Sequence, residues 1–224
     1  PSKKLPNLNI DCECSLSDIQ FNQEDIIKAI DEINENSACG EEDIPAIVLK
    51  KCKHILSYPI MHLWEESMRT GYIPKIYKRQ IITPIHKKDS RAVPGNYRPI
   101  SLTSHLIKIF ERVIRNQLVK HLEDNHLICQ NQHGFRKGRC CLTQLLAHIN
   151  SILENQLHND DTDVIYLDYE KAFDKVDHSI LLEKLKSYKI EGNLYNWISE
   201  YLSNRRQSVV IQGTNSNEAE VISG

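Results

Sequence analysis

The sequence contains no long uncharged apolar run, and its first residues form no apolar core. A membrane-spanning helix needs about 20 mostly apolar residues in succession, and a secretory signal needs a shorter apolar segment near its start. An initiator methionine is also absent, because the chain opens at Pro1. These absences predict a protein that neither enters a membrane nor is secreted, and a chain that begins inside a longer polypeptide.

Cysteines are present, but without the spacing of a structural framework. Their number, seven, is odd, and they are scattered along 224 residues. The two close pairs, Cys12 with Cys14 and Cys140 with Cys141, lack the two-residue gap of a zinc knuckle. This pattern is typical of reduced thiols, and it therefore predicts an intracellular protein without a disulfide framework.

The net charge is small but unevenly distributed. A total of −2 conceals a middle segment, residues 76–145, with 13 basic and 4 acidic side chains, which is net +9. The preceding residues 1–75 are net −5, and the following residues 146–224 are net −6. Short charge runs are commonly solvated faces, whereas an excess spread over a long segment favours a surface for a polyphosphate or a nucleic-acid backbone.

Capping residues and apolar periodicity predict several helices. Asn22 can cap the first helix, and Pro45 suits the first turn of a second. Pro59 is expected to break or kink that second helix, and Gly71 is expected to end the next stretch. Further helices are predicted over 104–124, over 142–157, after Asp177, which is expected to cap that helix, and through 194–202.

Strands are predicted where β-branched and aromatic residues cluster. The expected strands are 79–86, one beginning near Arg98, 164–169, 207–212 and 218–222. Pro94-Gly95 marks a turn between the first two, which predicts a hairpin with a basic tip. Because helices and strands mix without regular βαβ alternation, the predicted fold class is α+β.

The most informative stretch contains one of these strands. The apolar run Val164 to Leu167 leads directly into Asp168-Tyr169, and Phe173 follows five residues after the aspartate. An acid at the end of a strand places a carboxylate at the rim of a sheet, where a metal-bound phosphate could sit. Taken alone, such an aspartate is more often a helix cap or part of a solvated turn.

Two further blocks lie upstream in the basic segment. The first joins Pro84-Ile85-His86-Lys87-Lys88-Asp89-Ser90 to Asn96-Tyr97-Arg98-Pro99-Ile100-Ser101-Leu102, and the second is Gln132-His133-Gly134-Phe135-Arg136-Lys137-Gly138-Arg139. Lysine offers phosphate oxygens a compact charge, and arginine offers a planar fork. Glycines let a backbone approach a ligand closely.

Together and in this order, the three blocks resemble the reverse transcriptases of non-LTR (LINE-type) retrotransposons. The resemblance covers roughly residues 20–224. It implies the fingers and the first part of the palm of a right-hand polymerase, behind a helical N-terminal extension. The expected divisions are a linker over 1–20, the extension over 21–75, the fingers over 76–160 and the start of the palm over 161–224.

The resemblance also implies roles for single residues. Asp168, as the catalytic carboxylate, and the carbonyl of Tyr169 would bind Mg²⁺ for two-metal nucleotidyl transfer. Lys87 and Arg98 would grip the triphosphate of an incoming dNTP, while the ring of Phe173 would exclude rNTPs. Contacts with nucleic acid are expected from Lys88, Gly134, Phe135, Arg136, Lys137 and Arg139. The implied partners are an RNA template, a DNA primer or target, and the remainder of the parent polypeptide, in the cytoplasm and nucleus.

The chain departs from the family pattern in three places. No aromatic-x-Asp-Asp sequence follows Asp177, although the polymerase palm uses one to complete its metal site. Asp43 stands where the loop of the N-terminal extension usually has glycine. Cys140-Cys141 stands where small hydroxyl residues are usual.

Three functions therefore stay open. The first is an RNA-directed DNA polymerase of which this chain holds a part. The second is a non-catalytic nucleic-acid-binding relic of a truncated element. The third is a helical interaction domain unrelated to nucleic acid, which fits the amphipathic helices but would leave residues 84–102 and 164–185 unexplained.

Overall fold

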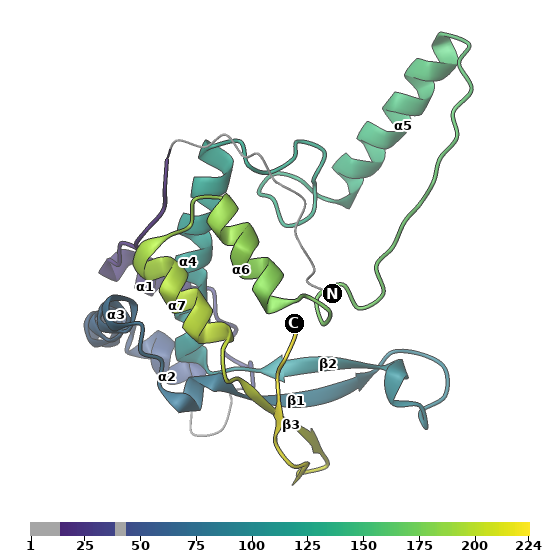
Figure 1. The fold of residues 1–224 in the computed structure, drawn as a ribbon. Coiled ribbons are helices and arrows are strands. Elements are labelled where there is room, and N and C mark those ends of the chain that lie inside the picture. The colour runs from purple at the N-terminus through teal and green to yellow at the C-terminus, as the bar shows by residue number, and fades with distance from the viewer. Residues whose placement is uncertain (1–13, 39–43) are drawn as a thin grey trace.

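The computed structural model describes residues 14–38 and 44–224, so most of the expected linker and Asp43 lie outside the described residues. A helical body carries a small sheet and a long helical arm (Figure 1). The helices are α1 (Gln23–Asp31), α2 (Ala46–Lys51), α3 (Lys53–Thr70), α4 (His105–Asp124), α5 (Cys141–Leu157), α6 (His178–Ser187) and α7 (Gly192–Leu202), with 3-10 turns η1 (Lys75–Lys78) and η2 (Pro94–Asn96). The strands are β1 (Arg79–His86), β2 (Tyr97–Leu102), β3 (Arg206–Ile211), β4 (Thr214–Asn215) and β5 (Ala219–Glu220). None of the helices in the described part is long and apolar enough to cross a membrane.

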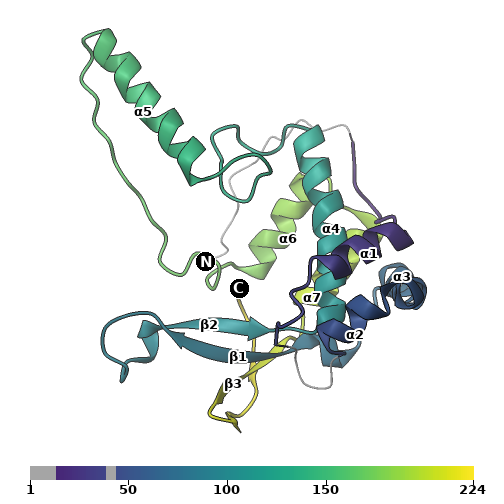
Figure 2. The same cartoon turned by 180° about the vertical axis from the view of Figure 1, so that it is seen from behind.

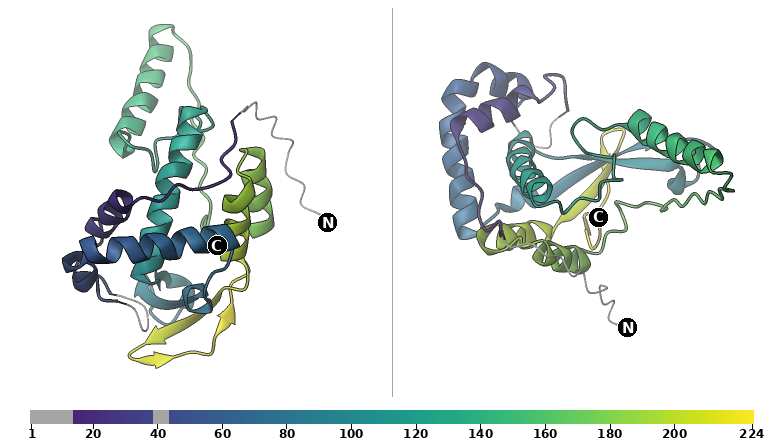
Figure 3. Two further views of the ribbon diagram at one scale, coloured as in Figure 1. Left: turned by 90° about the vertical axis from the view of Figure 1, so that its left-hand side faces the viewer. Right: turned by 90° about the horizontal axis from the view of Figure 1, so that it is seen from above.

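The core is organised around the ring of Phe110 on α4. The ring of Trp64 on α3 stacks on it with centroids 4.3 Å apart, and Trp197 of α7 meets it edge-on at 4.5 Å. Phe21 stacks on Phe110 at 5.3 Å. Such aromatic pairs contribute about 0.5–1.5 kcal/mol each beyond the area that they bury. Because the four rings come from distant parts of the sequence, they fix α3, α4 and α7 against one another (Figure 3).

Helix boundaries follow the predicted capping signals with one exception. The side chain of Asn22 accepts a hydrogen bond from Asp25 N and begins α1, and Gly71, with φ +69°, ends α3. Of the two effects predicted at Pro59, a break or a kink, the break is wrong, because α3 continues through Pro59 and the helices separate at Cys52 instead. Burial of residues beyond Pro59, such as Trp64, outweighs the backbone hydrogen bond that proline cannot donate.

The sheet is built on the predicted hairpin. β1 and β2 pair in antiparallel fashion, from Ile81 opposite Leu102 to His86 opposite Tyr97. β3 pairs in parallel with residues 79–82 of β1, and β4 and β5 pair with β3 in antiparallel fashion. Since β3 reaches only the base of β1, the outer part of the hairpin projects from the body (Figure 2).

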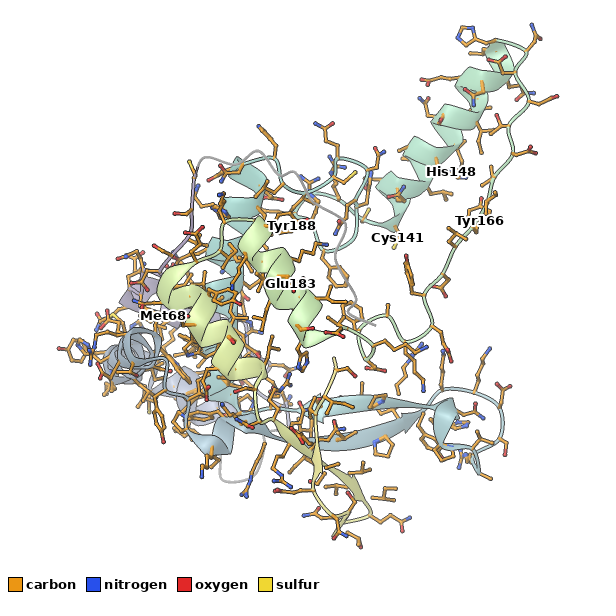
Figure 4. All side chains as sticks on the ribbon, viewed as in Figure 1. Met68, Cys141, His148, Tyr166, Glu183 and Tyr188 are labelled. Atoms are coloured by element: carbon orange, nitrogen blue, oxygen red, sulfur yellow. The ribbon has the colours of Figure 1, made fainter. Side chains whose placement is uncertain are left out.

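The arm consists of α5 and the segment that returns from it to α6, and it projects on the same side as the hairpin (Figures 1 and 2). No residue of α5 is buried. Across the arm, His148 Nε2 lies 3.1 Å from Tyr166 Oη (Figure 4). The predicted strand over 164–169 is wrong, because these residues pair with no strand in the described part of the chain. Their β propensity is insufficient, since an isolated strand leaves its backbone hydrogen bonds unmade.

A carboxyl–phenol pair joins α4 to α7. Tyr201 Oη donates a hydrogen bond of 2.5 Å to Glu111 Oε1. Burial raises the pKa of the Glu111 carboxyl, and this effect exceeds the lowering by the Tyr201 hydrogen bond and by the charge of Arg205. Burial, followed by the charge of Glu111, also raises the pKa of Tyr201. Arg205 lies over the Tyr201 ring and donates to Gln80 Oε1 of β1, so it links this pair to the sheet.

At the start of α7, the chain passes close to residues 14–20. Gly192 has φ +55°, and a Cβ atom there would lie 2.8 Å from Ser17 O. Ser17 O accepts a hydrogen bond of 3.0 Å from Leu194 N, so it cannot retreat without weakening that bond. Both the backbone conformation and the close approach therefore require glycine at this position.

We expect Gly192→Ala to destabilise the protein more than Gly71→Ala. Both residues have positive φ, which costs a non-glycine residue about 1–2 kcal/mol. Only Gly192 adds a clash, since a Cβ at Gly71 meets nothing within 4 Å. Overpacking of this kind adds about 1–3 kcal/mol. Urea unfolding measures the stability of both variants. Equal losses of stability would show that the protein accommodates a Cβ atom beside Ser17 without further cost.

We expect Glu111→Gln to stabilise the protein at neutral pH and to have little effect in acid. A carboxyl whose pKa is raised on folding contributes stability fully below its ordinary value of 4.5, and loses that contribution as the pH rises through the folded pKa. Glutamine still accepts the hydrogen bond from Tyr201 and does not ionise.

Urea unfolding between about pH 4 and pH 8 tests this expectation. The advantage of Glu111→Gln over the natural chain should grow with pH. Glu35→Gln, which replaces an exposed carboxylate, serves as the control and should follow the natural chain. A difference that stays constant across the range would contradict a pKa effect.

Candidate functional site

The first predicted block forms the projecting end of the β1–β2 hairpin. Lys87 N donates a hydrogen bond of 2.8 Å to Asn96 O, which extends the hairpin by one pair. The rings of His86 and Tyr97 meet edge-on at 5.3 Å, and Tyr97 Oη donates to Arg91 O at 2.9 Å. The tip is therefore held in shape by contacts among its own residues.

Lys87 and Arg98 lie on the same face of this hairpin. Arg98 stands opposite Ile85, and directly opposed residues point to one face of a sheet. Side chains alternate between faces along a strand, so Lys87, two residues after Ile85, returns to that face. Both basic residues are exposed, and neither has an ion-pair partner among the described residues. The hairpin thus presents two uncompensated cations as diagonal neighbours.

The second block is a tight loop between α4 and α5. Phe135 and Gly138 have positive φ angles of 62° and 74°. Arg139 Nη1 donates a hydrogen bond to Gln130 O. His133 Nδ1 lies 2.8 Å from Thr143 Oγ1 of α5. Gly134 is exposed, and a Cβ atom on it would meet nothing within 4 Å. The backbone at Gly134 is therefore open to close approach by a ligand.

Among the predicted nucleic-acid contacts, Arg136 differs from its neighbours. Only 18% of its side chain is exposed, and its Nε lies 3.5 Å from Glu123 Oε1 of α4. Its Nη1 donates to Cys129 O at 3.3 Å. Arg136 thus ties the loop to α4, whereas Lys88 and Lys137 are exposed. A contact between Arg136 and nucleic acid stays a prediction.

The third block lies on the segment that returns from the arm. Asp168 is exposed, and no hydrogen bond or ion pair joins it to another described residue. Tyr169 and Phe173 are 84% and 71% exposed, so Phe173 is not a core aromatic in this chain. Its ring meets that of Phe135 edge-on at 6.0 Å. The structure therefore joins the second and third blocks, while no such contact joins either of them to Lys87 or Arg98 in the described part.

Two aspartates beyond Phe173 have structural partners. The side chain of Asp177 accepts hydrogen bonds from Ser179 N and Ile180 N at 3.0 and 3.3 Å, which confirms that it caps α6. The carbonyl of Asp174 accepts a hydrogen bond of 2.9 Å from Ser223 Oγ. The end of the chain therefore packs against the turn that follows Phe173.

The expected two-metal site is only partly represented. In the described part of the chain, no three His, Cys, Asp or Glu side chains gather closely enough to hold a metal ion. The predicted ligands Asp168 and Tyr169 would offer one carboxylate and one carbonyl, whereas a pair of Mg²⁺ ions needs several oxygen ligands. The residues present suit one side of such a site and do not complete it.

Cys140, one of the two cysteines at which the resemblance leads us to expect small hydroxyl residues, is the N-cap of α5. Its sulfur accepts from the backbone of Thr143, and Thr143 Oγ1 accepts from Cys140 N at 2.9 Å, which forms a capping box. Hydrogen bonds from the backbone of Thr143 and Leu142 lower the pKa of the Cys140 thiol. The departure from serine or threonine therefore preserves the local structure.

Comparison with known proteins places the chain in a family. The family model described as reverse transcriptase (RNA-dependent DNA polymerase) matches residues 85–222, which contain all three blocks except Pro84. A probable RNA-directed DNA polymerase from transposon X-element of Drosophila melanogaster is 31% identical over 202 residues, covering 89% of this chain and 22% of that protein.

Two other relatives of this chain also come from retrotransposable or mobile elements. The RNA-directed DNA polymerase from mobile element jockey of Drosophila melanogaster is 31% identical over 163 residues, which cover 72% of this chain and 18% of the relative. The Pol polyprotein from type-1 retrotransposable element R2 of Popillia japonica is 25% identical over 77% of this chain and 23% of the relative. The chain thus spans about a fifth of the length of these relatives. It belongs to the reverse transcriptase family, and its predicted resemblance to the non-LTR retrotransposon members is confirmed.

Proposed function

We propose that this chain is part of an RNA-directed DNA polymerase of a non-LTR retrotransposon, and that it supplies the fingers and the first part of the palm. The observation that carries the proposal is the shared face of Lys87 and Arg98 on a projecting, self-supported hairpin. Two adjacent cations without carboxylate partners among the described residues suit the triphosphate of a dNTP, since charged hydrogen bonds to phosphate are strong. The family membership independently favours this substrate.

We propose separate roles for Asp168 and Phe173, as a metal ligand and as a contact beside the sugar of the dNTP. Asp168 would hold Mg²⁺ together with the carbonyl of Tyr169, and the metal would supply charge stabilisation for nucleotidyl transfer. Asp168 is exposed and has no cation bound to it among the described residues, so it is available as a ligand. Phe173 would fill the space beside the sugar. Its exposed ring is free to do so, because the only aromatic neighbour found for it in the described part is Phe135.

The remainder of a longer polypeptide is the proposed partner of the arm. The apolar side chains of α5 recur at helical spacing and are 42–82% exposed: Leu142, Leu145, Leu146, Ile149, Leu153 and Leu157. Fully burying one such side chain is worth about 1.5–3 kcal/mol. The run 164–167 is likewise exposed and pairs with no strand that the structure describes. A covering segment would satisfy both, and relatives of this chain are several times longer.

The division into a linker (1–20), a helical extension (21–75), fingers (76–160) and an initial palm (161–224) is part of this proposal. The proposed location is intracellular, which suits the reduced cysteines in the described part of the chain: Cys52, Cys129, Cys140 and Cys141. The proposed ligands are an RNA template, a DNA primer or target, and dNTPs. The net charge of +9 over residues 76–145 supports nucleic-acid binding.

The proposal is tested with the longest in-frame polypeptide that contains this chain, by measuring template-directed dNTP incorporation. We expect the polypeptide to incorporate dNTPs and Asp168→Asn to abolish this without altering its melting curve. Lys87→Gln or Arg98→Gln should raise the KM for dNTP roughly tenfold or more, because each removes a charged hydrogen bond to phosphate. The 224-residue chain alone should incorporate nothing.

Two substitutions serve as matched controls. Asp163→Asn removes an exposed carboxylate from the same segment as Asp168, and Arg91→Gln removes an exposed charge from the same hairpin tip. Both should retain incorporation. A longer polypeptide that binds nucleic acid but never incorporates dNTPs would favour the non-catalytic relic, and activity that survives Asp168→Asn would contradict the proposed palm.

The proposal that a segment of the longer polypeptide covers α5 leads to a separate prediction. In the 224-residue chain, Leu145→Glu should change stability by no more than about 0.5 kcal/mol, because this side chain is already 52% exposed. In the longer polypeptide, the same substitution should cost about 2 kcal/mol or more, since it would bury a charge. Thermal melts of both proteins measure this difference. Gln144→Glu is the control on α5, and a longer polypeptide indifferent to Leu145→Glu would show that the arm is not covered there.

A further inference from the structure

A hollow lies between the outer face of α4 and the loop of the second block. α4 lines it with Arg115 and Asn116, and the loop lines it with Phe135, Lys137 and Arg139. Nucleic-acid contacts are predicted for the loop residues, whereas no residue of α4 carries a predicted role. The fold brings the polar face of this helix beside the loop, and Arg136 fixes the two together through Glu123.

The carboxylates around this hollow are already paired. Glu123 pairs with Arg136, and Asp124 with Lys120 at 2.5 Å. Glu32 lies 3.3 Å from the Nε atom of Arg112. Arg115 and Lys137, by contrast, are exposed and have no ion-pair partner among the described residues. The uncompensated charge in the hollow is therefore positive and is contributed from both walls.

An aromatic ring stands at the same place. Phe135 is 81% exposed on a backbone with φ +62°, so a strained turn holds an apolar ring in solvent instead of burying it. Gly134 beside it leaves the backbone open. A ring next to basic side chains is the combination that binds single-stranded nucleic acids, where bases stack on the ring and phosphates meet the cations.

We propose that this hollow binds a single-stranded polynucleotide, with Arg115 contacting a phosphate and Phe135 stacking on an unpaired base. The inference rests on the proposed function and extends its nucleic-acid surface from the loop onto α4. A duplex suits the site less well, because its bases are stacked internally and cannot lie on Phe135 without being displaced. An acidic peptide would satisfy Arg115 and Lys137 and would leave the ring of Phe135 without a role.

The test uses the 224-residue chain and fluorescein-labelled single strands of about 12 nucleotides, one oligo-U and one oligo-dT, in an anisotropy titration at several salt concentrations. Arg115→Gln should reduce the slope of log K against log salt by about 0.7, the value for one lost phosphate contact on a single strand. Phe135→Ala should weaken binding roughly tenfold and leave the slope unchanged, and Phe135→Tyr should restore it. Lys51→Gln, an exposed lysine on α2 outside the hollow, should change neither quantity.

Three results would overturn the inference. One is no binding of either strand, and another is binding that Arg115→Gln and Phe135→Ala leave unchanged. The third is displacement of the strand by oligoglutamate of equal length as readily as by unlabelled strand, which would indicate an acidic peptide. Equal binding of oligo-U and oligo-dT supports a site that reads the backbone, and a preference for either one supports the site and identifies its sugar. Incorporation by the longer polypeptide is a separate measurement, so the proposed function can stand if this surface fails.

Discussion

The ring of Phe110 is the contact on which the placement of the candidate site depends. It receives Trp64, Trp197 and Phe21 from three separate stretches of the chain. α4, which carries Phe110, follows β2 almost directly, so one end of the hairpin is attached to this cluster. The other end is attached through buried Lys78, which pairs with Glu200 of α7 just before β1 begins. The projecting tip with Lys87 and Arg98 is therefore carried by a base that is held at both ends.

Local signals in the sequence were sufficient wherever a few neighbouring residues decide the structure. Asn22 and Asp177 cap helices as predicted, and the hairpin between residues 79 and 102 has the expected turn. They were insufficient where the deciding partner is distant. β3 lies beside β1 although Gln80 and Gln207 are 127 positions apart, and no periodicity specifies such a neighbour. For the same reason the apolar run at 164–169 was misread as a strand, since its composition gives a propensity but supplies no partner.

The candidate site shows the same division between local and distant information. The shared face of Lys87 and Arg98 follows from strand alternation and the hairpin register, and both are close in sequence. The anchoring of Arg136 by Glu123 could not be foreseen, because a basic residue in a glycine-containing loop has the same sequence signature whether it faces phosphate or an acid on a neighbouring helix. Arg115, which we propose as a phosphate contact, has no distinctive sequence signal for a similar reason. On a polar helix face it is indistinguishable from a solvated residue until the fold places a loop opposite it.

The exposed arm carries both an uncovered apolar surface and Asp168, so covering the one would also affect the position of the other. Asp168, Tyr169 and Phe173 stand on the same segment as the unpaired run 164–167, and no hydrogen bond holds the carboxylate of Asp168 to the body in the described part of the chain. A metal ligand must be fixed to within a fraction of an ångström to act, which an unpaired extended segment cannot achieve. Whatever surface pairs with residues 164–167 would therefore position Asp168 as well. On this reasoning, the apolar area left uncovered on the arm and the unfixed position of Asp168, the proposed metal ligand, have one cause, and docking of one segment on residues 164–167 would remedy both.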